Sequence, residues 1–443
     1  MGITAGIIVG ILILSLLMFI HELGHYITGR LLGFKIIEFS LFMGPVLLSK
    51  TSKKTGIKYS LKLLPIGASV RFSGEEGMGE DATEDPNAFN KKEKWKRAVV
   101  IATGPVVNII AGILALIILF ASIGFTSTTV LDTSVDSQAS IAGIQKDDKV
   151  VSVSGARIWT SIDYTLELSF VKDANPLTLK VIRPGTSDEI EFKLTPVKKT
   201  TYRLGITTQI VQATNENQNE WQVVSADPKS NAGNPVFKKG DVLVSINGVS
   251  TKDRALASAQ VSQSGGKAIS VVILRNGSEM TVETLTTLFE YYSDRGVNFT
   301  AKHGIINALS ESVRYSASIV KLTFKAISKI FTGEIAAKDG LSGPVGVVDM
   351  VGAVVNQDAP LVAKLADLLW MFALISLNLG VFNLLPIPAL DGSHLLLIIV
   401  EAIRGKKLTP KVENTIVIIG FLLIIGLAIM GLVFDIMRIA GRS

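Results

Sequence analysis

Four stretches of the chain carry no charged residue over a length that can cross a lipid bilayer. They cover Met1–Ile20, Ala98–Leu131, Leu368–Leu390 and Thr415–Phe434. An α-helix needs about 20 apolar residues to span the hydrocarbon core. The second helix is expected to end near Gly124, where Ser and Thr become frequent. The pattern therefore predicts a membrane protein with four transmembrane helices.

Between the first two stretches the pattern is that of a β-structure. Residues Ile57–Leu63 alternate apolar and polar side chains, as in a strand with one buried face. Leu64–Gly67 interrupts the alternation and Ala68–Phe72 resumes it, which predicts a β-hairpin over 57–73. This unit is either an ordinary surface hairpin or one that packs against the membrane helices and offers an edge strand. The candidate edge consists of Ile66, Gly67, Ala68, Ser69 and Val70.

Residues Ile305–Phe331 have the pattern of an amphipathic helix rather than of a membrane span. Lys321, Lys325 and Lys329 recur every four residues, opposite apolar side chains. Such a helix either lies in the membrane interface or packs on the β-rich region that precedes it.

The region between the second and third stretches contains an internal repeat. Asp148–Gly155 matches Asp241–Gly248 at an offset of 93 residues, and a segment of small residues precedes each copy. This length exceeds a solenoid unit and suits a small domain. The Val and Ile content predicts two β-rich domains of one kind. The expected domains are 1–125, 126–213, 214–300 and 301–443.

Composition and charge placement support a membrane protein and indicate its orientation. Apolar residues make up 48% of the chain, and the mean hydropathy is +0.43. From Arg30 to Arg97 there are 13 Lys and Arg against 8 Asp and Glu. Because basic loops stay in the cytoplasm, this segment is expected there, with Thr126–Asp367 and both termini outside. The link between the last two stretches is basic too, through Arg404, Lys406, Lys407 and Lys411.

The composition also excludes several classes of site. The net charge of +6 is too modest to indicate a nucleic-acid partner. With no cysteine in the chain, a metal must be bound by His and carboxylates. The first stretch has no Lys or Arg before its apolar core and no small-residue cleavage site, so a cleaved signal peptide is not expected. A multi-pass protein of the plasma membrane is the expectation.

The first apolar stretch leads into the sequence His21-Glu22-Leu23-Gly24-His25. In a helix, two His at i and i+4 lie on one face and can bind one metal ion. Glu22 between them is placed to activate a water molecule at the metal. Ionisable groups at membrane depth are costly and usually mark function. The motif therefore predicts a metal site within the first helix.

Asp391 is the expected third ligand. A catalytic zinc usually has three protein ligands and one open position, and His303 lies in the external region. His21 and Asp391 each follow about 20 residues of apolar helix, or about 30 Å, on helices that run in the same direction. The two should therefore lie at one depth, which favours a ligand over an ordinary Asp-Gly turn. A set of two His and one carboxylate with HExxH favours zinc over other divalent ions.

The repeated region resembles PDZ domains of the bacterial type. The second copy carries Lys239-Gly240-Asp241 and Ile246-Asn247-Gly248, whereas the first has Asp147 and Ser154 where Gly and Asn are usual. PDZ domains bind extended peptides by strand addition. Two roles stay open for the pair: peptide capture, or steric shielding of the membrane site.

The chain as a whole resembles the site-2 protease family. HExxH in the first helix, the motif Asn383-Leu384-Leu385-Pro386-Ile387-Pro388-Ala389-Leu390-Asp391-Gly392 and the PDZ pair between them carry the resemblance over essentially the whole chain. It implies zinc bound by His21, His25 and Asp391, with Glu22 as general base. It also implies that asparagines hold the substrate backbone: Asn108, in the Gly-x-x-x-Asn element of the second helix, and Asn378 and Asn383. His394 is either a residue that supports the ligands or a polar residue at a helix boundary.

The resemblance further implies the second cut in regulated intramembrane proteolysis. The expected partners are membrane lipid and single-span membrane proteins, namely anti-sigma-factor stubs and leftover signal peptides, which connects the enzyme to envelope stress. A substrate helix must unwind before attack because its carbonyls are engaged in i to i−4 hydrogen bonds. The asparagines and the hairpin edge would then bind the unwound backbone. The PDZ pair would exclude substrates whose outer domains are intact.

Two other classes compete with the enzyme. A transporter could use intramembrane His, Glu and Asp as an ion pathway, although four helices without a visible inverted repeat argue against it. A catalytically inactive scaffold would present PDZ domains on a membrane anchor. It would tolerate loss of Glu22 or of a ligand, yet all four positions are intact. The sequence does not indicate an oligomeric state.

Overall fold

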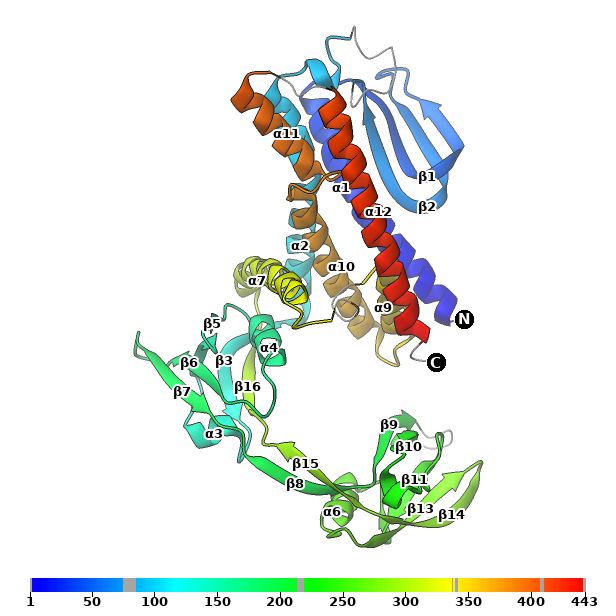
Figure 1. Ribbon diagram of the computed structural model, residues 1–443, viewed down its shortest axis with the longest axis vertical. Helices are drawn as coiled ribbons and strands as arrows, with labels where there is room; N and C mark the ends of the chain where they lie inside the picture. The colour runs from blue at the N-terminus through cyan, green and yellow to red at the C-terminus, as the bar shows by residue number, and fades with distance from the viewer. Residues whose placement is uncertain are drawn as a thin grey trace. The chain divides into compact units, whose positions relative to one another are not determined.

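Figure 1 shows the computed structural model, which describes residues 2–74, 85–212, 219–336, 338, 342–406 and 410–440. Contacts divide the chain into two compact units. One comprises Met1–Thr128, Arg157–Glu167 and Phe299–Ser443, and the other Thr129–Ala156 and Leu168–Asn298. The boundary expected at 213–214 and the basic residue Lys407 lie outside the described residues.

The first unit contains the four long apolar helices expected from the sequence. They are α1 (Gly2–Leu31), α2 (Lys94–Ile123), α10 (Leu361–Leu384) and α12 (Pro410–Ala440). Within the described residues, four helices are long and apolar enough to cross a membrane, which confirms the prediction. Helix α2 ends at Gly124 as expected. Gly124 has φ +82°, a conformation that favours glycine.

The third apolar stretch is not one continuous helix. Helix α10 ends at Leu384, and a separate helix α11 (Asp391–Arg404) begins at the predicted ligand. Pro386 and Pro388 lie in the break, and proline cannot donate the helical hydrogen bond and disfavours a helical conformation at the residue before it. The prediction of one helix over Leu368–Leu390 is therefore wrong at its C-terminal end. Part of the link to the fourth span is helix α11 instead of loop.

Glycines allow the membrane helices to approach one another closely. A Cβ on Gly24 of α1 would lie 2.8 Å from the Thr103 carbonyl oxygen of α2, and one on Gly380 of α10 would lie 2.6 Å from the Pro105 oxygen. Small residues at such crossings bring backbones together in a membrane. Helix α9 (Pro344–Asn356), which the sequence analysis did not predict, packs on α1 through Gly6.

Helix α7 spans Ile305–Phe331, the range expected for the amphipathic helix. It packs on α2 and α10 through Ala308 and Ile319. Its lysines turn toward acidic residues: Lys321 Nζ lies 2.5 Å from Asp163 of α4 (Ser161–Ser169), and Lys325 pairs with Glu167 of the same helix. Helix α7 is thus a packed element of the first unit. An apolar strip that begins at Ile306, 82% exposed, remains on its surface.

The predicted hairpin over 57–73 is wrong in its pairing. Residues Lys58–Phe72 form one strand, β2, and its antiparallel partner is β1 (Ile36–Thr51), which the sequence analysis did not predict. The chain reverses within β2, because Tyr59–Leu61 run parallel to Phe39–Leu41 whereas Ala68–Val70 run antiparallel to them. Gly67, with φ +82°, lies in this bend, and β1 lies between the two arms. Strand β1 meets β2 along two stretches, because Phe39 has both Val70 and Tyr59 as register partners. This sheet lies beside α1 (Figure 1).

The repeated region consists of two sets of elements in the same order. The first set is β3 (Phe125–Thr133), α3 (Gln138–Ala142), β4 (Lys149–Val153), β5 (Ala156–Arg157), α4, β6 (Leu177–Ile182) and β7 (Glu189–Leu194). The second is β10 (Asn219–Ala226), α5 (Ser230–Gly233), β11 (Val242–Ile246), β12 (Val249–Ser250), α6 (Arg254–Ser262), β13 (Ala268–Arg275) and β14 (Ser278–Leu285). The sheets run β16-β3-β4-β6-β7 and β14-β13-β11-β10-β9. Strands β9 (Ile206–Gln212) and β16 (Val297–Lys302) therefore extend the two sheets at equivalent edges.

The residues that match in the repeat also match in their contacts. Asp148 accepts hydrogen bonds from Arg183 at 2.8 Å, and Asp241 accepts them from Arg275 at 2.6 and 2.7 Å. Asp147, at the position of Gly240, has φ +68°, and Gly240 has φ +95°. The first copy thus keeps the left-handed backbone conformation of this turn, although it has Asp147 where the second copy has a glycine. A two-stranded ribbon of β8 (Lys198–Arg203) and β15 (Thr287–Tyr292) flanks the second copy.

Candidate metal centre

The predicted ligands converge on one point. His21 Nε2 lies 3.0 Å and His25 Nε2 lies 3.6 Å from Asp391 Oδ2, and the two Nε2 atoms are 3.2 Å apart. One ligand atom from each residue lies within 4.8 Å of the others. Both His are buried and Asp391 is partly buried. Helix α1 supplies the two imidazoles one turn apart, and the break after α10 brings Asp391 to them.

The hydrogen bond at the far side of His25 fixes which nitrogen faces the cluster. His25 Nδ1 lies 2.9 Å from the carbonyl oxygen of Val100 in α2. A carbonyl oxygen only accepts, so Nδ1 carries the hydrogen and Nε2 keeps its lone pair. A metal-binding His commonly donates its other ring N–H to such an acceptor. His25 is therefore oriented for metal binding through Nε2.

Asn108 of α2 performs the corresponding task at His21. Its amide nitrogen is placed 3.4 Å from His21 Nδ1, while its buried oxygen has no hydrogen-bond partner. Amide oxygen and nitrogen are assigned from the hydrogen-bond network. If the amide is turned over, His21 Nδ1–H donates to Asn108 Oδ1, which removes the unpaired oxygen and leaves Nε2 free for a metal. Asn108, predicted as a substrate-binding residue, thus lies against a ligand.

Gly104, four residues before Asn108, is required by the other ligand. A Cβ at this position would lie 2.3 Å from His25 Nε2 and 2.5 Å from Cε1. The His25 ring cannot move aside without losing its hydrogen bond to Val100. The two named residues of the Gly-x-x-x-Asn element therefore each accommodate one imidazole.

Glu22 connects the centre to the sheet. Its Oε2 accepts a hydrogen bond of 2.9 Å from the backbone N–H of Val70 in β2. Ser15 of α1 donates to the Pro65 carbonyl oxygen at 2.6 Å, which holds the same strand on the same helix. The strand that contains the candidate edge residues therefore runs directly past the candidate general base.

The position of Asp391 at the start of α11 stabilises its carboxylate. A carboxylate at a helix N-terminus is stabilised by the helix dipole. Gly392 is needed next to it, since a Cβ there would lie 2.1 Å from the Leu385 carbonyl oxygen.

The other candidate residues are not all brought to the cluster. Asn378 Oδ1 accepts a hydrogen bond of 2.8 Å from Thr323 of α7. Asn383 lies in the last turn of α10, half-buried, just before the break. His303 lies beside Gly124, 16 residues beyond Asn108 and so about 24 Å along α2. The exclusion of His303 as a ligand thus agrees with the fold.

Within the edge segment, the five candidate residues differ in their surroundings. Ile66 is 48% exposed, whereas Gly67 and Ala68 are buried. Ser69 shares a hydrogen bond of 2.7 Å with Ser40 of β1, and Val70 donates to Glu22. Sequence reasoning missed strand β1 and the contact of Glu22 with Val70. The only available signal was the apolar run after Phe34, which does not alternate cleanly.

The donor set fits zinc. Two imidazole nitrogens and one carboxylate oxygen are three protein ligands of the type that catalytic zinc uses, and three ligands leave a fourth position for water or substrate. The hydrogen bond at His25 Nδ1, and the one at His21 Nδ1 once the Asn108 amide is turned over, are the supporting contacts that such ligands need.

The model of peptidase family M50 matches residues 9–427 of this chain. A Pasteurella multocida protein that is inferred to be a zinc metalloprotease is 28% identical to this chain. The alignment covers 97% of this chain and 98% of the Pasteurella protein. A protein of Agrobacterium fabrum with the same assignment is 26% identical, over 99% and 97%. The regulator of sigma E protease of Haemophilus influenzae is 26% identical, over 97% and 98%. The chain therefore belongs to peptidase family M50, the site-2 protease family of zinc metalloproteases.

Proposed function

We propose that this protein hydrolyses a peptide bond within the transmembrane segment of single-span membrane proteins. The observation that carries the proposal is the convergence of His21, His25 and Asp391 within a set of helices long enough to cross a bilayer. A soluble substrate would not need a metal site at this depth. The basic residues around the sheet support a cytoplasmic location for that side of the protein, and we propose that the repeated domains lie outside the plasma membrane.

The catalytic step rests on Glu22. Zinc, when held by His21, His25 and Asp391, supplies a Lewis acid and lowers the pKa of water that it binds. Glu22 removes the proton from the attacking water as the water adds to the scissile carbonyl carbon. It then delivers that proton to the leaving amine nitrogen as the C–N bond breaks. The burial of the site keeps bulk water from competing with the substrate.

The unwound substrate is held by the exposed edge of β2. Residues 68–72 pair with β1 on one side, and Val70 directs its N–H away from β1 to Glu22. Because backbone directions alternate along a strand, Ala68 also directs its N–H away from β1. An extended segment added to this edge would pass beside Glu22. We propose that Asn383, in the last turn of α10 before the break, binds the same segment.

A proline substitution in the edge, compared with an alanine substitution at Asn383, tests this binding mode. Ala68→Pro removes one outward donor, and strand edges tolerate proline. We expect it to raise the KM for a transmembrane substrate at least as much as Asn383→Ala does. Metal content is the control, because both variants leave the three ligands in place. Unchanged turnover in both variants would show that the edge does not bind substrate.

The substrates proposed are anti-sigma-factor stubs and leftover signal peptides. The name of the Haemophilus influenzae relative, regulator of sigma E protease, supports the first of these. We propose that the repeated domains are PDZ domains, on the common order of their elements and the Gly-Asp and Asn-Gly turns. Placed outside the membrane, they would exclude substrates with intact outer domains.

The deciding experiment is cleavage of a single-span anti-sigma-factor stub by purified protein in detergent. The wild type should cut the stub, a chelator should abolish the cut, and Glu22→Gln should lose at least 100-fold in kcat, about the contribution of a general base. Bound zinc in Glu22→Gln is the control for an intact site. Cleavage that survives both treatments would refute the mechanism. Absence of both metal and cleavage would favour an inactive scaffold.

A further inference from the structure

A cavity of about 410 Å³ lies between α1 and the face of the sheet that turns toward it. Its lining residues are Phe19, Phe39, Leu41, Leu48, Ser49, Lys50, Tyr59, Ser60 and Leu61. This volume is in the range of ligand-binding cavities. The lining is mostly apolar, and the cavity has no part in the metal centre described above.

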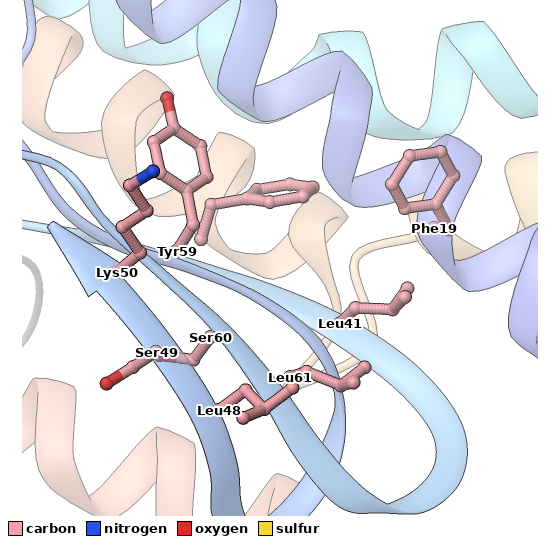
Figure 2. A pocket seen from close by; sticks show the side chains of 9 residues that line it. Phe19, Leu41, Leu48, Ser49, Lys50, Tyr59, Ser60 and Leu61 are labelled. Atoms are coloured by element: carbon pink, nitrogen blue, oxygen red, sulfur yellow. The ribbon is translucent and has the colours of Figure 1, made fainter. Parts of the chain in front are cut away.

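The cavity is polar at one end only. Figure 2 shows Lys50 beside Tyr59, with Phe19, Leu41 and Leu61 grouped away from them. The Tyr59 hydroxyl is hydrogen-bonded to that of Tyr26 at 2.7 Å. Arg30, one turn further along α1, donates to Tyr26 at 3.3 Å. A cation and hydroxyl groups therefore border one end of an otherwise apolar space.

Basic charge predominates around this end, where Glu38 accepts a hydrogen bond of 2.6 Å from Ser60 and pairs with Lys58 at 3.6 Å. The sequence contains no Asp or Glu between Glu38 and Glu75, whereas six basic residues fall in that interval: Lys50, Lys53, Lys54, Lys58, Lys62 and Arg71. Among the described residues, no carboxylate lies within ion-pair distance of Lys50, which is exposed. The sheet also has an apolar end, where Leu47, Leu48, Leu63 and Leu64 are each more than half exposed. Apolar and basic ends on one sheet match the acyl and headgroup layers of a bilayer.

We propose that this cavity binds one anionic phospholipid. An acyl chain would lie between Phe19, Leu41 and Leu61, and the phosphate would be bound by Lys50, with the Tyr59 and Arg30 groups beside it. The proposal rests on the membrane orientation given under the proposed function, which puts the sheet at the anionic cytoplasmic leaflet. The lipid would hold the sheet, and with it the strand that contacts Glu22, on α1.

The pairing of the strands limits where a peptide could bind in this cavity. Phe39, Ser40 and Leu41 have Tyr59, Ser60 and Leu61 as register partners, so their backbone groups are used within the sheet. Leu48, Ser49 and Lys50 pair on one side only, so among the described residues the sheet has a second free edge here. The edge that meets Glu22 is the one at residues 68–72, through Val70. We therefore assign the peptide to that edge and the lipid to the cavity, and competition between a peptide and the lipid tests this assignment.

Native mass spectrometry of the full-length protein in detergent, titrated with phosphatidylglycerol or phosphatidylcholine, tests the proposal. The wild type should bind one phosphatidylglycerol about fivefold more tightly than phosphatidylcholine, as expected for one lysine at a membrane surface. Lys50→Glu should remove this preference. Lys53→Glu makes the same charge change in the turn between β1 and β2, outside the cavity lining, and should keep this preference.

A second pair of variants tests the apolar part. Leu61→Trp fills the cavity and should abolish binding of both lipids, whereas Leu64→Trp, at an exposed position outside the lining, should not. Lys50→Gln serves as a milder variant if Lys50→Glu does not fold. Lipid retention needs no hydrolysis, so this test is independent of the protease assay.

Three outcomes would overturn the proposal. Equal effects of Lys50→Glu and Lys53→Glu would mean non-specific attraction to a basic surface. Binding of sn-glycerol 3-phosphate as tight as that of phosphatidylglycerol would mean a phosphate site without a chain. The third outcome concerns an apolar helical peptide. If this peptide displaces the lipid from the wild-type protein and does not bind to Leu61→Trp, the cavity binds substrate and not lipid.

Discussion

At the scale of single residues, the candidate metal centre depends on contacts that lie behind the proposed ligands. His25 is oriented by the Val100 carbonyl and fits only because residue 104 has no side chain. His21 is oriented by Asn108. The ligand types were predictable from HExxH, because the helical repeat alone places two imidazoles on one face. The roles of Gly104 and Asn108 required the crossing of α1 and α2.

Gly104→Ala should weaken metal binding. The added Cβ would lie 2.3 Å from His25 Nε2, a distance that forces the ring away from its position. We expect a loss of at least tenfold in zinc affinity, measured by competition with a chromophoric chelator, and a matching loss of cleavage. Gly426→Ala is the matched control, since a Cβ on this glycine of α12 has no neighbour within 4 Å. Equal zinc affinity in the two variants would contradict the account.

Asn108→Ala should also weaken zinc binding, by about 10- to 100-fold, as removal of such supporting contacts does. Asn108→Asp keeps an acceptor for His21 Nδ1–H and should retain more of the affinity than Asn108→Ala. A substrate-binding role predicts a different result, namely a raised KM with unchanged zinc affinity. Zinc competition and steady-state kinetics on both variants therefore separate the two roles.

At the scale of elements, the internal repeat was predictable from the sequence. The Asp–Arg pair that stabilises each copy was not. The sequence match placed Asp148 and Asp241 at equivalent positions, but their Arg partners lie 35 and 34 residues later. The sheet beside α1 shows the opposite case. The alternation over Ile57–Leu63 was interpreted correctly as a strand, yet its partner β1 was missed, because pairing between distant segments leaves no local signal.

The buried pair of Asp241 and Arg275 should make the second repeat sensitive to acid. Burial raises the pKa of Asp241, but hydrogen bonds from Arg275 and from the Lys238 backbone hold it below its usual range. A carboxylate with a lowered pKa stabilises the fold fully above its unfolded pKa of about 3.9, and the contribution is lost as the pH falls through the folded value. Stability of this repeat should therefore fall below about pH 4.

Hydrogen exchange of peptides from residues 242–285 in the full-length protein measures this effect. Asp241→Asn should destabilise the repeat by about 3 kcal/mol at neutral pH, since it leaves Arg275 without its charged partner. Glu290→Gln is the control, because it removes a surface ion pair with Lys198, in the ribbon beside the same repeat, and surface ion pairs contribute little to stability. If Asp241→Asn and Glu290→Gln have the same effect, the pair does not stabilise the repeat.

At the scale of the whole molecule, the second repeat can be removed without cutting through an element. Arg203 and Thr287 are register partners in the β8–β15 ribbon, so the chain leaves and returns at adjacent positions. Residues 204–286 can therefore be replaced by a short Gly-rich turn. Helix α4, which pairs with α7 in the first unit, would stay intact.

We expect this shortened protein to cut substrates whose outer domains are intact, while cleavage of trimmed stubs stays within about twofold of the full-length enzyme. The physical reason is steric, since a filter acts on the size of the substrate and not on the metal centre. Cleavage of a trimmed and an untrimmed substrate is compared in the same detergent. If the untrimmed substrate stays uncut while the trimmed stub is cut normally, the second repeat is not the filter.

The sequence by itself determined the number of spans, the candidate ligands and the repeat. These depend on composition and on spacing along one helix, which hydrophobicity and the helical period dictate locally. Only the tertiary structure decided that the third stretch breaks before Asp391, that Glu22 meets Val70, and that Asn108 turns to His21. Each is a contact between segments far apart in the chain, set by how helices and strands pack. Packing of that kind is decided by the shape of both partners together, so neither segment carries the information alone.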